Sequence, residues 1–379
     1  MTPGATDTKP SSSTSSSYVP RMPVKQKMAV SFKSLMSSVL GRGGSSTGGP
    51  APLFDLFTKT DPAVDGDDCL RDCEGCSVKY PRNFKIEEDD ALYGHVTEWA
   101  THALVATSKT DWVRDSAEEP GSVMQAIERG HEKPSNGKMK LSASNIPTPN
   151  DTTDYSEPTT VLLLPAFTLV RNVQPSNVSQ FITEIVSNAP TNTSPMAPFT
   201  FPASLPSAAA GVPSLTTESC PHRVIVLLCS QKTRDARCGQ SAPLIRKEME
   251  RHLRPLGLAR DLHDERPGGV GIYFIDHVGG HKYSANVMIY RRPNAFGHDE
   301  QPVSATNGTT TVTNGNGSTH HAAPHPENDL GAAQCIWLAR VRPEDCENLV
   351  RYTILKGKVV KPERQLRGGF DRCKGLMSW

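Results

Sequence analysis

Apolar residues along the chain gather in two segments, and strand and helix patterns follow a similar order in both. In the first segment, the expected strands are residues 102–107, 138–143 and 160–170, and the expected helices are 121–129 and 177–187. In the second, the expected strands are 222–230, 269–278, 285–292 and 335–341, and the expected helices are 241–253 and 343–354. Strands this rich in Val and Ile are typical of a sheet buried on both faces. The pattern predicts an α/β protein with a thioredoxin-like layer of helices on a mixed sheet, the first segment being a degenerate copy of the second.

Polar, low-complexity stretches separate these segments and predict the domain organisation. We expect a disordered Ser- and Gly-rich tail at 1–60, a smaller N-terminal α/β lobe at 61–186, a Pro/Ala/Ser linker at 187–218 and a C-terminal thioredoxin-like α/β domain at 219–379. The last domain contains a polar insertion at 293–331. We expect this insertion to be a disordered surface loop, because the entropic cost of closing a loop grows slowly with its length.

One stretch of the tail differs from the rest. Residues 24–42 combine Lys and Arg with apolar residues at helical spacing, namely Met28, Phe32, Leu35, Met36 and Val39. A mitochondrial targeting segment, a mobile basic tail and a docking helix all show this pattern. The sequence does not separate the three.

Overall composition narrows the class of protein. The formal net charge is +1, which gives no electrostatic indication of a nucleic-acid or membrane-surface partner. No apolar run reaches the roughly 18 residues that a membrane-spanning helix needs. The chain has nine cysteines and no basic patch followed by an apolar stretch at its N-terminus. We therefore expect a reducing compartment, where cysteines bind metals or act in redox chemistry rather than forming disulfides.

Two cysteines of the second segment are expected in loops beside the sheet. Cys229 ends the expected strand at 222–230, and Cys238 follows nine residues later, before a helix expected to open near Pro243. Basic residues of the intervening loop and the nearby helix N-terminus would favour thiolates over thiols. Two ordinary cysteines, one of them buried at a strand end, fit the pattern as well.

The stretch HVGGHKYS joins two expected strands and places His277 and His281 four residues apart. A zinc-protease helix needs H-E-x-x-H with the glutamate as general base. Here Val278, Gly279 and Gly280 intervene, so the base is missing and helix propensity is low. We expect a loop whose glycines let the backbone approach a metal centre closely. A hairpin turn with two surface histidines is the alternative.

These four residues belong to strand-end loops that could converge at one edge of a sheet. Two thiolates and two imidazoles suit either structural zinc or a 2Fe-2S cluster, and the spacing does not decide between them. Asp276 and Lys282 flank the histidines and could support the ligands by hydrogen bonding. Solvated loop charges are the alternative for both.

The stretches CSQKTRDARCGQSAPLIRK and IDHVGGHKYSANVMIYRRPN are similar to the fungal sucrase/ferredoxin-like family. The similarity is to its actin-patches-distribution type, whose sibling is the altered-inheritance-of-mitochondria type. The resemblance covers most of residues 218–379 and includes both cysteines, the R-D-x-R-C-G run, H-V-G-G-H-K and the following A-N-V. It is thinner over residues 61–186, where SKTDWVRD is the best local match.

The resemblance implies a C-terminal thioredoxin-like ferredoxin domain that carries a 2Fe-2S cluster. It also implies that Cys229 and Cys238 bind one iron and that His277 and His281 bind the other. Such ligands are of the Rieske type, but the Rieske spacing C-x-H is absent. Replacing two thiolates by imidazoles removes two negative charges, so we expect a reduction potential above that of a four-cysteine ferredoxin. We also expect that potential to depend on pH, because imidazole ligands can exchange a proton.

The chain would then be a one-electron carrier with redox partner proteins rather than an enzyme. It lacks the G-x-S-x-G elbow and the paired carboxylates that would support a hydrolase. A structural zinc protein that uses the same four ligands as an interaction module is the alternative.

The chain ends in Met377-Ser378-Trp379. This tripeptide resembles the short C-terminal signal by which clients engage the cytosolic iron–sulfur targeting complex. The resemblance implies a cytoplasmic protein, with a mitochondrial location as the alternative. A terminal Trp without such a role is equally compatible with the three residues.

A second cysteine cluster, CLRDCEGC, has the spacing C-x3-C-x2-C at Cys69, Cys73 and Cys76. Radical-SAM enzymes share this spacing, but they need a barrel of repeated βα units, whereas a polar loop follows here. A thiol–disulfide pair of Cys73 and Cys76 and a zinc site with an unidentified fourth ligand are further possibilities. We expect incidental exposed cysteines.

Overall fold

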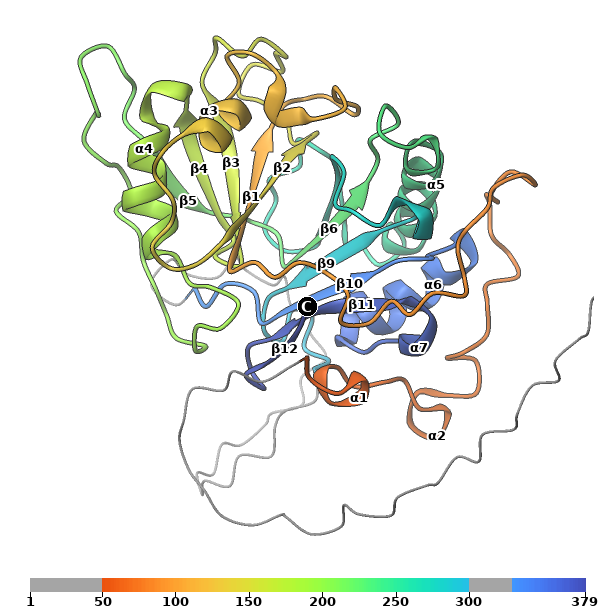
Figure 1. Cartoon of the computed structure of the whole chain (residues 1–379). Helices are drawn as coiled ribbons and strands as arrows, with labels where there is room; N and C mark the ends of the chain where they lie inside the picture. Colours follow the sequence, from red (N-terminus) through yellow and green to blue (C-terminus); the bar gives the residue numbers. More distant parts are fainter. Residues whose placement is uncertain (1–49, 300–328) are drawn as a thin grey trace, which may run out of the picture. The chain divides into compact units, whose positions relative to one another are not determined.

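Twelve strands form one mixed sheet in the computed structural model, which describes residues 50–299 and 329–379 (Figure 1). The strand order is β12-β11-β10-β9-β6-β8-β2-β1-β3-β4-β5, and β7 pairs with β8 outside this path. The strands of the first half are β1 (Thr101–Ala106), β2 (Met139–Ser144), β3 (Thr159–Leu164), β4 (Thr168–Val173) and β5 (Thr216–Ser219). Those of the second half are β6 (Val224–Cys229), β7 (Ala259–Arg260), β8 (Val270–Ile275), β9 (Val287–Arg291), β10 (Gln334–Leu338), β11 (Leu366–Asp371) and β12 (Leu376–Ser378).

The α-helices are short except for α5. They are α1 (Leu53–Leu56), α2 (Pro62–Asp65), α3 (Val123–Arg129), α4 (Val178–Gln180), α5 (Ala236–Leu253), α6 (Cys346–Asn348) and α7 (Pro362–Gln365). Tighter or wider turns extend α4 and α6 into longer helical segments: η2 (Pro175–Asn177), η3 (Phe181–Ile185), η4 (Val186–Asn188), η7 (Pro343–Asp345) and η8 (Leu349–Ile354). Two isolated turns are η1 (Ser116–Glu118) and η5 (His281–Tyr283). None of the described helices is long and apolar enough to cross a bilayer.

The two halves of the sheet have the same topology. In the first half, β1 is parallel to β2 and antiparallel to β3, and β3 is antiparallel to β4. In the second half, β6 is parallel to β8 and antiparallel to β9, and β9 is antiparallel to β10. A helix connects each parallel pair, α3 in the first half and α5 in the second. The predicted α/β class is confirmed, and the order is compatible with a thioredoxin-like layer in each half, although that fold assignment stays a prediction.

The halves meet where β2 and β8 run antiparallel, with Ser144 opposite Ile275. One core lies beneath the helices and includes Ile127 of α3 and Ile245 of α5. A second core contains residues of both halves, so the helix-free faces of the two halves pack against each other. Two contacts mark this packing. The Nδ1 atom of His102 lies 3.0 Å from the Tyr290 hydroxyl, and the rings of Trp99 and Trp337 meet edge-on at 5.4 Å.

Two expected elements differ in the structure for local reasons. Residues 160–170, expected as one strand, form the hairpin of β3 and β4 with Pro165 between them, because a proline cannot donate to a central ladder. Helix α5 begins at Ala236 rather than near Pro243, because the Asp235 side chain accepts a hydrogen bond from the backbone N–H of Arg237 and caps the helix earlier.

Parts of the expected tail, linker and insertion pack against the sheet. Leu56 and Phe57 are buried although they lie within the expected tail, and Leu205 N–H donates to the carbonyl of Leu215 at 2.8 Å within the expected linker. Phe296, at the start of the expected insertion, is also buried. The amphipathic stretch at 24–42 and most of the insertion lie outside the described residues. The predicted domain boundaries stay a prediction.

Candidate metal centre

The two predicted cysteine ligands meet at the end of β6. Cys229 is the last residue of this strand and Cys238 lies in the first turn of α5, and both side chains are buried. Their Sγ atoms are 3.5 Å apart. Two thiolates on one tetrahedral ion, with bonds of about 2.3 Å, lie about 3.8 Å apart. The pair is therefore spaced for a single metal ion.

The two sulfurs are within hydrogen-bonding distance of each other. This hydrogen bond lowers the pKa of Cys229 against the opposing effect of burial, and His277 adds to the lowering. The same contact, together with burial, raises the pKa of Cys238. A metal ion that bound both sulfurs as thiolates would displace a proton from the pair.

His277 reaches the same site from the neighbouring strand. It follows β8, which is parallel to β6, so both strands end at the same edge of the sheet. A ring nitrogen of His277 lies within 4.8 Å of both sulfurs. Its Nδ1 atom is buried and has no hydrogen-bond partner among the described residues, while its backbone N–H donates to Gln231 Oε1 at 3.0 Å. A buried ring nitrogen without a partner, beside two sulfurs, fits a metal ligand.

His281 lies beside this group but outside it. It begins the short turn η5 and its side chain is exposed. The ring centroids of His277 and His281 are 5.4 Å apart. The structure therefore gathers three of the four predicted ligands within 4.8 Å and places the fourth next to the third.

A buried arginine from a distant strand holds the histidine loop. Arg367 of β11 donates to the carbonyl oxygen of Gly279 at 3.1 Å and to Asn286 Oδ1 at 2.7 Å. Gly280 has a φ of 67°, and a Cβ there would lie 2.7 Å from the Arg367 guanidinium. Burial lowers the pKa of Arg367 to about 10, so the side chain still carries a positive charge at neutral pH.

Sequence reasoning missed Arg367, and it assigned the glycines a different neighbour. We expected Gly279 and Gly280 to make room for a metal centre, whereas Gly280 makes room for a guanidinium. Asn286 lies in the A-N-V run that carried the family resemblance, so its position was visible but its role was not. No local motif marks Arg367, which lies 81 residues beyond Asn286 along the chain.

The two charged residues that flank the histidines have structural contacts. Asp276 is buried and accepts a hydrogen bond from Ser116 Oγ of the first half, and burial raises its pKa to about 6. The exposed Lys282 forms an ion pair with Asp90. Asp276 therefore ties the loop to the first half of the sheet, and Lys282 ties it to the segment before β1.

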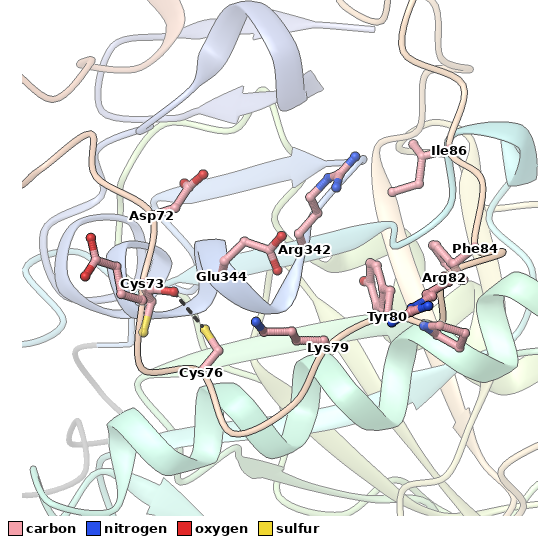
Figure 2. Close-up of a pocket in the computed structure, with 12 residues that line it drawn as sticks. Asp72, Cys73, Cys76, Lys79, Tyr80, Arg82, Phe84, Ile86, Arg342 and Glu344 are labelled. Atoms are coloured by element: carbon pink, nitrogen blue, oxygen red, sulfur yellow. Dashed lines mark hydrogen bonds between the residues drawn. The ribbon is translucent and has the colours of Figure 1, made fainter.

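The three cysteines of CLRDCEGC do not converge. Cys69 is buried against Tyr352 and Val360. Cys73 and Cys76 line a cavity of about 520 Å³, in which Figure 2 shows the Cys76 sulfur directed at the backbone carbonyl of Cys73. This separation removes the geometric basis for a three-cysteine cluster of the radical-SAM type among the described residues.

Comparison with known proteins gives consistent matches. The model of the sucrase/ferredoxin-like family matches residues 92–368. The chain is 31% identical over 253 residues to actin patches distal protein 1 of Saccharomyces cerevisiae, covering 63% of this chain and 77% of that protein. It is 26% identical over 186 residues to altered inheritance of mitochondria protein 32 of Clavispora lusitaniae, covering 49% of this chain and 50% of that protein.

No solved structure matches the chain. The family match nevertheless spans both halves of the sheet and all four predicted ligands, from β1 through β11. The chain belongs to the sucrase/ferredoxin-like family.

Proposed function

We propose that this protein carries single electrons on a 2Fe-2S cluster held by Cys229, Cys238, His277 and His281. The observation that supports the proposal most is the buried pair of sulfurs 3.5 Å apart, with a ring nitrogen of His277 within 4.8 Å of both. The family to which the chain belongs is itself ferredoxin-like in name. When bound, the cluster would supply one electron-accepting site. The protein's own residues set the charge and proton balance around it.

Open space beside the loop that contains His277 and His281 supports the proposal. With the thiolates on one iron and the imidazoles on the other, the rings must lie farther from the sulfurs than they would around a single ion. Gly279 has a φ of 84°, and a Cβ at this position would meet no atom within 4 Å, so the loop has open space on that side. His281 already lies on the outer side of His277.

Two features of the site bear on electron transfer. Arg367, buried behind the loop, places a positive charge near the cysteines and would favour the reduced state, in which the site is more negative. His281 is exposed, so its ring can exchange a proton with water when the charge of the site changes. Together they support proton-coupled transfer of one electron, with a potential that falls as pH rises.

A structural zinc site is the second candidate, and one observation favours it. The ligand atoms of Cys229, Cys238 and His277 lie within 4.8 Å of one another, which suits a single ion. Zinc would take these three residues and one further ligand in a tetrahedral site.

Anaerobic purification followed by visible absorption, metal analysis and EPR of the dithionite-reduced protein tests the proposal. We expect a red-brown protein with about two irons per chain and a rhombic EPR signal. The signal should be lost in His277→Ala and in His281→Ala, but kept in His263→Ala, whose ring is exposed far from the site. A colourless protein whose zinc is lost in Cys229→Ser but kept in His281→Ala would establish the zinc site instead.

We further propose a cytosolic protein with redox partner proteins, loaded by the cytosolic iron–sulfur targeting complex through Met377-Ser378-Trp379. A mitochondrial location is the alternative. In the structure β12 pairs with β11, and the ring centroids of Trp379 and Trp99 lie 4.0 Å apart, so these three residues must detach before they bind as a free tail. Deleting them should lower iron occupancy in cells but leave chemical reconstitution of the purified protein unchanged. Equal occupancy in cells would refute the role.

A further inference from the structure

We propose a second metal site, in which Cys73 and Cys76 bind one zinc-type divalent ion together with Glu248 and His252 of α5. The ligand atoms of Cys73, Cys76 and Glu248 lie within 4.8 Å of one another. The Nε2 atom of His252 is 3.5 Å from Glu248 Oε1, and His252 also lies within 4.8 Å of Cys73 in a second group with Glu347. Tetrahedral zinc with Cys, His and carboxylate ligands keeps its donor atoms about 3.3–3.8 Å apart. Small rotations of the half-buried Cys73, Cys76 and His252 side chains around the buried Glu248 would therefore complete the set of ligands.

Three of these groups already converge on one positive charge. The Arg251 guanidinium donates to Glu248 Oε1 at 2.7 Å, to Cys73 Sγ at 3.5 Å and to His252 Nε2 at 3.0 Å. The Arg251 side chain is 39% exposed, whereas the Glu248 side chain is fully buried. The Glu248 carboxylate is thus held inside the protein, whereas the Arg251 guanidinium that it contacts can move out into solvent. A divalent ion could take the place of the guanidinium.

Charge balance supports the same assignment. Two thiolates and one carboxylate carry three negative charges, and neutral His252 adds none. A divalent ion leaves the group with one net negative charge, which Arg251 can balance from its surface position.

The site is open to solvent. Cys73 and Cys76 line the cavity of about 520 Å³, and Figure 2 shows their sulfurs at one end of it, above helix α5. Ser77 fixes the buried carboxylate from the other side, since its N–H and its hydroxyl donate to Glu248 Oε2 at 3.2 and 2.8 Å. An ion has a path of entry and finds one ligand already oriented.

Such a site would fasten a segment that lacks regular structure. Between the end of α2 at Asp65 and the start of β1 at Thr101, no helix or strand is described. The proposed ion would hold this segment to α5, about 15 Å along the helix from Cys238. The second site would therefore also brace the helix that presents a ligand to the first.

Cobalt substitution in the full chain separates the two sites. In a Cys229→Ser/Cys238→Ser background, we expect the metal-free, reduced protein to bind one equivalent of Co²⁺ with a thiolate-to-cobalt charge-transfer band. Adding Cys73→Ser and Cys76→Ser should abolish the band, and Glu248→Gln should weaken binding at least tenfold. Arg251→Gln should bind at least as tightly, because a competing cation is gone. Cys373→Ser, at an exposed cysteine, is the matched control and should change nothing.

Alkylation keeps the test valid where a variant fails to fold. Zn²⁺ at two equivalents, enough to fill the Cys229/Cys238 site as well, should slow iodoacetamide labelling of Cys73 and Cys76 at least tenfold in the otherwise unaltered chain, and a chelator should restore the rate. Absence of the cobalt band in the Cys229→Ser/Cys238→Ser background, or a Cys73–Cys76 disulfide that forms in air and is unaffected by zinc, overturns the proposal. Neither outcome bears on the 2Fe-2S proposal, which rests on different cysteines.

Discussion

The two halves of the sheet share one topology but differ at the strand ends where chemistry is possible. Strand pairing places Ala106 at the end of β1 where the second half has Cys229, because Ala106 pairs with Ser144 as Cys229 pairs with Ile275. Two residues beyond those partners, the first half has Ile146 and the second has His277. Ala106 and Ile146 are both buried in the core between the halves. The same backbone positions hold apolar packing in one half and candidate ligands in the other.

This difference shows that the fold sets the position of a possible site, whereas a few side chains determine whether that site can bind a metal. The first half still contributes to the site, but through support. Asn145 of the first half accepts a hydrogen bond from the backbone N–H of Phe274 at 2.7 Å and donates its own N–H to the carbonyl of Phe274 at 3.1 Å. Ser116 holds Asp276, the residue before His277. The second half carries the candidate ligands, and the first half supports the loop that holds His277.

The largest expected effect comes from exchanging residues at the corresponding strand ends. Cys229→Ser should lower the iron bound after anaerobic purification at least tenfold, because serine cannot supply a thiolate to the buried site. Ala106→Ser makes a similarly small change at the matching position of the first half and should leave the iron content unchanged. Iron analysis of both variants provides the test. Equal iron content in Cys229→Ser and the unaltered chain would place the iron site elsewhere.

A pH effect is expected from a buried histidine that precedes β6. Burial lowers the pKa of His222 to about 4, and its Nε2 atom lies 3.1 Å from the Tyr273 hydroxyl. The unfolded chain, with a pKa of about 6.5, binds the proton first, so the stability contributed by neutral His222 is lost as pH falls from about 6.5 to 4. Between pH 7 and 4.5 this loss amounts to about 2.5 kcal/mol in the free energy of unfolding.

Urea unfolding of the unaltered chain and of His222→Gln at both pH values measures the effect. The quantity to compare is the difference in the free energy of unfolding between the two proteins at each pH. Burial also raises the pKa of Asp276 to about 6, which makes both proteins more stable as pH falls through the same range, and the difference removes this shared effect. His263→Gln is the control, since that ring is exposed. A difference that does not change with pH would show that His222 binds a proton equally well in the folded and the unfolded chain.

A smaller effect is expected at the junction of the halves. Asn145→Ala removes the acceptor for the Phe274 N–H and should lower the free energy of unfolding by about 2 kcal/mol, since a buried donor loses its partner. The buried Nδ2 of Asn145 has no partner among the described residues, so its removal offsets part of the cost. Asn188→Ala, at an exposed position, should change stability far less. Equal effects of the two substitutions would mean that the junction hydrogen bond contributes nothing.

Local features of the sequence were enough to predict much of the second half. Cys229 at the end of β6 and Cys238 in the first turn of α5 lie nine residues apart, so the meeting of these two cysteines followed from one strand–helix connection. His277 was also predictable, because parallel strands bring their ends to the same edge. The strand β11 escaped prediction because Gly368 and Gly369 weaken its apolar pattern.

What could not be predicted depends on contacts between residues far apart in the chain. Arg367 reaches the His277 loop from another strand, and Glu248 reaches Cys73 and Cys76 across more than 170 positions. Neither contact has a local pattern, because each side chain lies in an ordinary strand or helix. The pairing of Ser144 with Ile275, which joins the halves, likewise depends on how two sheet edges meet.

The smallest expected effect is a difference between alanine substitutions at Gly279 and Gly280, the two glycines of the loop between His277 and His281. Both have positive φ, 84° at Gly279 and 67° at Gly280, so alanine at either should cost about 1 kcal/mol in backbone strain. Only at Gly280 would the new methyl meet the Arg367 guanidinium, at 2.7 Å, and this side chain is held by Gly279 and Asn286. Gly280→Ala should therefore cost about 1 kcal/mol more than Gly279→Ala. It should also speed the release of bound metal to a chelator severalfold. If the two variants release metal at the same rate, Arg367 does not hold the loop, and the glycines serve the turn alone.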